Sequence, residues 1–189
     1  MAKRKEASKE SNSKSVYAAN TVQQPVNSHT LTILVDNEPG VLARVIGLFS
    51  GRGYNIESLT VAETDHTKHL SRITIVSSGT ALVIEQIKAQ LERMVPVRKV
   101  RDLSVTGPFV DRELALIKVA GKGEKRVEAL RIADIFRAKV VDSTLESFIF
   151  EITGPASKVD GFIELLRPLG VVEVSRTGVA AIARGKAAE

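Results

Sequence analysis

The stretch best suited to chemistry is a turn, Asn37-Glu-Pro-Gly40, that leads into a predicted helix. Pro39 suits the first turn of a helix because its missing N–H would have no partner there. Asn37 or Glu38 is expected to cap this end. A helix that opens on Gly40 can bring backbone N–H groups close to a ligand, and these groups and the helix dipole favour a carboxylate or phosphate. The alternative is a plain strand–turn–helix connection that binds nothing.

Other groups that could do chemistry are sparse. The absence of Cys excludes disulfides, thiolate metal sites and Cys nucleophiles. His66 and His69 lie near Glu63 and Asp65 in a predicted hairpin turn, where a solvated polar cluster is favoured over a metal site. The run 121–125 lacks the spacing and the Ser or Thr of a phosphate-binding loop. The sequence therefore offers no candidate catalytic residue and no metal site.

Much of the formal net charge of +5 lies in residues 1–28, which hold five basic and two acidic side chains. This segment is rich in Lys, Ser, Asn and Gln, so we expect a disordered basic extension. The remaining chain is nearly balanced, which argues against a nucleic-acid-binding surface. No stretch is long and apolar enough to cross a membrane. The lack of Cys fits a cytoplasmic protein.

The periodicity of apolar residues predicts the order βαββαβ twice. The first unit has strands at 29–36, 54–62, 69–77 and 95–105, with helices at 39–50 and 80–93. Gly51 and Gly53 are expected to end the first helix in left-handed conformations. After a break at 106–109, the second unit has strands at 113–120, 138–145, 148–153 and 170–176, helices at 124–137 and after Gly154-Pro155, and a short final strand at 179–183.

The predicted fold class is α+β, with two ferredoxin-like βαββαβ domains in tandem at residues 29–105 and 106–189. Each sheet would have one face covered by two helices. The other face is expected to carry Leu34, Ile73 and Ile75 or their neighbours. Because that face or the sheet edge needs a partner, we expect at least a homodimer.

The run from Asp36 to Ala62, and above all Arg44–Ala62 (RVIGLFSGRGYNIESLTVA), closely resembles the ACT domain of the small, regulatory subunits of acetolactate (acetohydroxyacid) synthase. The resemblance continues at residues 69–75 and 86–103, and in the second half at 113–119 and 135–142. It implies a regulatory, amino-acid-binding ACT domain at 29–105, followed by the C-terminal domain of this subunit at 106–189.

The resemblance also implies a function. Members of this family are non-catalytic: they activate a separate large catalytic subunit and confer feedback inhibition by valine in branched-chain amino acid (valine, leucine, isoleucine) biosynthesis. Thiamine diphosphate, magnesium and FAD are then expected on that partner, and no cofactor on this chain. The valine site would lie between the ACT domains of a homodimer. Matched motif by motif, it would use Asn37, Glu38, Pro39, Gly40, Val41 and Leu42 of one chain, with Asn55 and Ile56 of the other.

Two alternatives come from other classes of protein. A free-standing ACT-domain amino-acid sensor could act on another enzyme or on gene expression, and would be expected to have a helix-turn-helix or a basic face. A small enzyme with an unrecognised active site would show turnover as an isolated chain.

Overall fold

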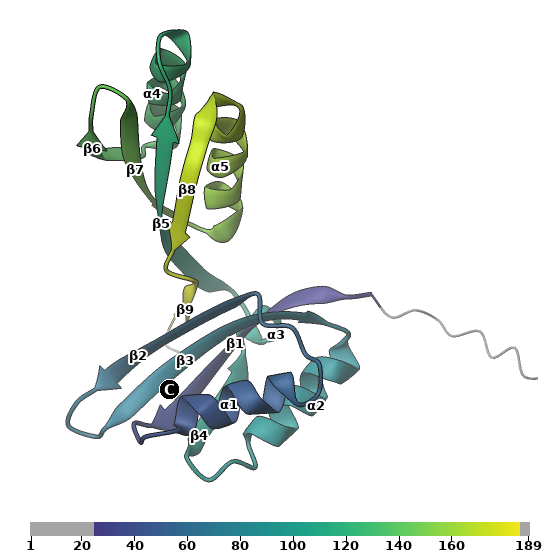
Figure 1. Cartoon of the computed structure of the whole chain (residues 1–189). Coiled ribbons are helices and arrows are strands. Elements are labelled where there is room, and N and C mark those ends of the chain that lie inside the picture. The colour runs from purple at the N-terminus through teal and green to yellow at the C-terminus, as the bar shows by residue number, and fades with distance from the viewer. Residues whose placement is uncertain (1–24, 186–189) are drawn as a thin grey trace, which may run out of the picture.

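Residues 25–185 are described by the computed structural model, so the predicted N-terminal extension lies outside the described residues up to residue 24. The chain forms two ferredoxin-like βαββαβ domains in tandem (Figure 1). The elements of the first domain are β1 (Asn27–Asp36), α1 (Val41–Ser50), β2 (Ser58–Asp65), β3 (Leu70–Gly79), α2 (Ala81–Leu91) and β4 (Val97–Asp102).

The first sheet is antiparallel, with the strand order β2-β3-β1-β4, and both helices cover one of its faces (Figure 1). The prediction that Ile73 and Ile75 lie on the opposite face is wrong. The register pairs them with Ile33 and Leu31, and since side chains alternate along a strand, all four point the same way. They are buried in the core that includes Phe49 of α1.

The open face of this sheet is polar and basic. Leu34, as predicted, lies on it, beside Arg72 of β3 and Lys99 of β4. Strand β9 (Ala180–Ala183) lies over the same face and encloses a hollow of about 250 Å³ with these side chains and Arg101. The open face is therefore partly covered by the end of the chain itself.

The predicted strand at 95–105 ends earlier, at Asp102, and a short helix α3 (Leu103–Thr106) follows. The Asp102 side chain causes this ending, because its Oδ1 accepts a hydrogen bond from the Ser104 N–H at 2.9 Å. Its Oδ2 lies 2.7 Å from Nδ1 of His29, and both residues are buried. Asp102 thus joins β1, β4 and α3.

The second domain has the strand order β6-β7-β5-β8, with a core of apolar residues between this sheet and the helices α4 and α5. Its elements are β5 (Phe109–Ala120), α4 (Glu124–Phe136), β6 (Lys139–Ser143), β7 (Ser147–Gly154), α5 (Ala156–Gly170) and β8 (Val171–Arg176). Phe150 and Phe162 are fully buried there and meet edge to face, at 6.1 Å between ring centroids.

A narrow neck joins the domains (Figure 1). The first four residues of β5, Phe109–Arg112, pair with β9, while the rest of β5 belongs to the second sheet. Leu103, Val179 and Ala181 form a small buried cluster in the neck, against Val76 of the first sheet. Across residues 25–185, no helix has the length and apolar character needed to span a membrane.

Candidate functional site

The turn before α1 has the predicted position but a different cap. Gly40 is the N-cap residue, with a left-handed φ of 83°, and no side chain of the described residues bonds to this helix end. The prediction that Asn37 or Glu38 caps the helix is therefore wrong. The backbone holds the turn instead: the Asn37 N–H donates to the carbonyl of His69 at 2.7 Å, and the Glu38 N–H donates to the carbonyl of Asp36 at 2.9 Å.

The uncapped start of α1 leaves backbone donors available. The N–H of Val41 makes only a long bond of 3.4 Å to the Glu38 carbonyl. The N–H groups of Gly40, Leu42 and Ala43 donate no hydrogen bond to any part of the chain that the structure describes. Together with the helix dipole, these donors form a place where a carboxylate would be stabilised.

One of the two acidic side chains next to this turn is paired with a basic group. Asp36 comes immediately before the turn, and its Oδ1 accepts a hydrogen bond from Nε of Arg98 at 2.8 Å. The same bond raises the pKa of Arg98 above its ordinary value. The Asp36 carboxylate is thus paired with a guanidinium, and the exposed Glu38 side chain is the acidic group of the turn itself.

The predicted site residues differ in exposure. Asn37, Glu38, Pro39 and Gly40 are exposed, whereas Val41 is buried in the core of the first domain. Leu42 is 37% exposed, so its side chain is available to a ligand. Val41 therefore fixes the helix on the sheet, and Leu42 supplies an apolar contact beside the N–H groups.

Asn55 and Ile56 lie beyond the other end of α1, since the helix separates them from the turn. A helix of ten residues is about 15 Å long, so one chain does not bring the two halves of the predicted site together. Ser77 Oγ donates to the Asn55 carbonyl at 2.7 Å, which fixes the backbone of Asn55 while this residue stays exposed.

Between the end of α1 and Asn55, Gly53 has a left-handed φ of 69°. Gly51 is right-handed, so its predicted left-handed conformation is wrong.

The histidines of the first hairpin form a surface cluster. His66 Nδ1 lies 2.7 Å from Oε2 of Glu63, on a side chain that is largely exposed. Within residues 25–185, no three His, Cys, Asp or Glu side chains converge to hold a metal ion.

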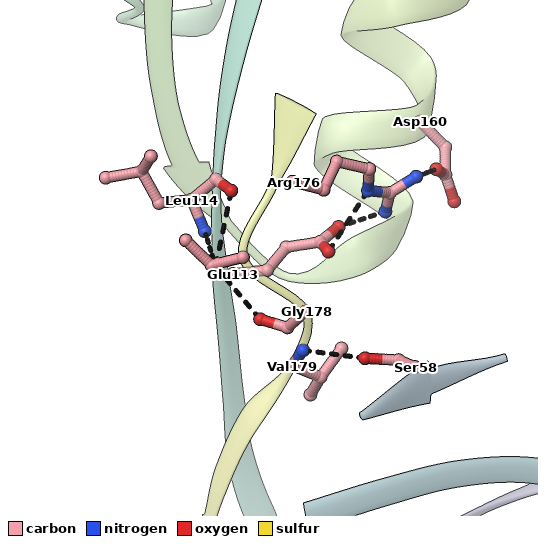
Figure 2. Close-up of polar contacts among 8 residues, drawn as sticks. Ser58, Glu113, Leu114, Asp160, Arg176, Gly178 and Val179 are labelled. Atoms are coloured by element: carbon pink, nitrogen blue, oxygen red, sulfur yellow. Dashed lines mark hydrogen bonds and ion pairs between the residues drawn. The ribbon is translucent and has the colours of Figure 1, made fainter. Parts of the chain in front are cut away.

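A polar cluster at the neck was not predicted from the sequence. Glu113 of β5 is buried and binds Arg176 of β8, which also binds Asp160 of α5 (Figure 2). The hydrogen bonds that Arg176 donates to the carboxylates of Glu113 and Asp160 raise the pKa of Arg176, although burial opposes this. Residues 63 positions apart carry no local signal for such a pair.

The first domain combines a βαββαβ fold with a glycine turn that exposes helix N–H groups, and the comparison with known families identifies it as an ACT domain. Residues 31–99 match the family model of the AHAS small subunit-like ACT domain, and residues 112–185 match that of the small subunit of acetolactate synthase. The chain belongs to the family of acetolactate synthase small subunits.

Individual relatives agree with this assignment. The acetolactate synthase small subunit of Aquifex aeolicus is 49% identical over 160 residues, 84% of this chain and 82% of that protein. The small subunit of isozyme 3 from Escherichia coli is 45% identical over 156 residues, 82% of this chain and 94% of that protein. The crystal structure of the Thermotoga maritima small subunit has a TM-score of 0.76 at 42% identity, covering 85% of this chain and 99% of that one.

Proposed function

We propose that this chain is the non-catalytic regulatory subunit of a cytoplasmic acetolactate synthase. It activates the large catalytic subunit and confers valine feedback inhibition in branched-chain amino acid biosynthesis. Family membership across both domains supports the partnership. The observation that carries the effector role is the uncapped start of α1, where three backbone N–H groups are available to a carboxylate. Thiamine diphosphate, magnesium and FAD would belong to the catalytic partner.

The proposed valine site uses two chains of a homodimer. The N–H groups of Gly40, Leu42 and Ala43 would hold the valine carboxylate. The amides of Asn37 of the same chain and Asn55 of the second chain would meet its polar groups. Leu42 of one chain and Ile56 of the other would enclose the isopropyl group.

Two observations support a site shared between chains. The turn and residues 55–56 lie at opposite ends of α1 in one chain, so these two halves of the same chain cannot form one valine site together. Asn55 is exposed, while its backbone is fixed by Ser77. A second copy can therefore meet a preformed surface. Valine that bridges two chains would fix their relative orientation, and the catalytic subunit would be regulated if it prefers one orientation over another.

A mixed dimer tests this arrangement. Gly40→Asp should block the turn half and Asn55→Ala should weaken the other half, so each variant alone should lose valine binding in isothermal titration. In a two-fold dimer, each site takes its halves from different chains. A mixed dimer of the two variants, co-expressed with different tags and purified through both, therefore has one intact site and should bind valine again. If the mixed dimer binds no valine while the wild-type protein does, the proposal that two chains share each valine site is wrong.

A further inference from the structure

A direct polar contact in the neck joins the two domains. The N–H of Val179, between β8 and β9, donates a hydrogen bond to Oγ of Ser58 at 2.8 Å (Figure 2). Ser58 is the first residue of β2 in the ACT domain. The contact therefore links the start of an edge strand to the segment that leaves the C-terminal sheet.

Gly178, the neighbouring residue, lets the two backbones come this close. Its φ is +83°, and a Cβ built on it would lie 2.8 Å from Oγ1 of Thr60, 3.0 Å from Oγ of Ser58 and 3.1 Å from the carbonyl oxygen of Leu59. The approach to Thr60 is closer than Cβ atoms adopt, and the approaches to Ser58 and Leu59 are tight, so a side chain here would push against β2. Glycine is thus required both by the conformation and by the approach to β2.

On the C-terminal side, the contact is held firmly. Thr177 donates its N–H to the carbonyl of Leu114 at 3.0 Å and accepts a hydrogen bond from the Leu114 N–H on its Oγ1 at 3.1 Å. Arg176 binds both carboxylate oxygens of the buried Glu113 and donates to Asp160 of α5 at 2.7 Å. A displacement at Gly178 must therefore carry β5 and α5 with it.

On the ACT side, the contact adjoins the proposed effector site. Ser58 comes two residues after Ile56, and the backbone between them is fixed to β3, since the Glu57 N–H donates to the Val76 carbonyl at 2.8 Å. A ligand that contacts residues 55–56 therefore acts on the strand end that bears Ser58. A hollow of about 460 Å³ lies beside the contact and is lined by both domains, so the domains have room to shift about it.

We propose that the contact of Ser58 with Gly178 and Val179 is the coupling element that transmits occupancy of the effector site to the C-terminal domain. This inference rests on the proposed function. Valine would change the position of the strand end at Ser58. The segment 176–179 is bound to β2 on one side and to Glu113 and Leu114 on the other. It would therefore convert this change into a new orientation of the C-terminal domain.

Gly178→Ala tests the coupling, with Gly185→Ala as a matched control. Both glycines have left-handed φ angles, 83° and 79°, so alanine brings similar backbone strain to each. At Gly185, no atom of the described chain lies within 4 Å of the added Cβ. The full chain is assayed for valine binding by isothermal titration. With the catalytic subunit, it is assayed for acetolactate formation across a valine titration.

We expect Gly178→Ala to bind valine with wild-type affinity in isolation, while the valine concentration for half inhibition rises by about fivefold or more, the low end of allosteric couplings. Gly185→Ala should behave as the wild type. Ser58→Ala, which removes the bond without a clash, should change inhibition in the same direction and covers the case that Gly178→Ala does not fold.

The outcomes separate the two proposals. If the wild-type protein neither binds valine nor confers inhibition, the proposed function fails. If it does both, and folded Gly178→Ala and Ser58→Ala are inhibited like the wild type, only the coupling role is overturned. Loss of valine binding in these variants would also overturn it, because the contact would then shape the site rather than transmit its occupancy.

Discussion

Substitution of Gly40 by Asp or Asn isolates the charge interaction at the proposed carboxylate site. The two side chains have the same shape, both tolerate left-handed backbone better than other residues, and no described atom lies within 4 Å of a Cβ at this position. Both variants should therefore fold alike. Only Asp places a negative charge next to the N–H groups of Leu42 and Ala43, where the valine carboxylate would bind.

The expected penalty follows from Coulomb's law. Two unit charges about 4 Å apart repel by about 4 kcal/mol at an effective dielectric constant of about 20, and by about 1 kcal/mol in bulk water. Because the turn is exposed, the true value should lie between these limits. Gly40→Asp should therefore bind valine about fivefold to a thousandfold more weakly than Gly40→Asn.

Isothermal titration of valine into both variants measures this difference, and circular dichroism melting curves check that their stabilities match. The difference should shrink as salt is added, because exposed charges are screened. Equal valine affinities for the Asp and Asn variants at low salt would refute the placement of the carboxylate at this helix end.

Three further predictions concern stability and titration. Asp102→Ala should lower the free energy of unfolding by about 2–4 kcal/mol in urea, since it leaves buried His29 without its partner and removes the cap of α3; Asp102→Asn, which keeps an acceptor, should cost less. Phe162→Ala should cost about 3–5 kcal/mol in the same assay, because the ring is fully buried in the C-terminal core. Hydrogen bonds, the largest effect being that of the Thr67 side chain, lower the pKa of Asp65 to about 2. The stabilising contribution of the Asp65 carboxylate is therefore complete above the ordinary pKa of 3.8 and is lost as the pH falls through about 2. An NMR titration of Asp65 should show this midpoint, and Thr67→Val should raise it.

The sequence was sufficient for the order of the elements other than the short helix α3, because each longer helix and strand has its own periodicity and is bounded by Gly, Pro or polar runs. It was not sufficient for the faces of the first sheet. Alternation separates the residues of β3 into two sets, but only the register with β1 decides that Ile73 and Ile75 face the helices. Similarly, glycine permits a left-handed φ angle without requiring one. The sequence therefore could not show that Gly53 has a left-handed φ angle and Gly51 a right-handed one.

The candidate site was predicted in part. The turn and its glycine were visible because their signal is local. The buried state of Val41 and the cap supplied by Gly40 itself depend on how α1 sits on the sheet. The neck was missed for a different reason: the partners of Glu113 and Ser58 lie 63 and 121 residues away, and only the folded chain brings them together.

Reconstitution with the large catalytic subunit of acetolactate synthase tests the central claim most directly. Acetolactate formation is measured with the catalytic subunit alone, with this chain added, and with valine added to the mixture. We predict that the chain stimulates the catalytic subunit and that valine suppresses this stimulated activity. No stimulation and no response to valine would contradict the proposed function.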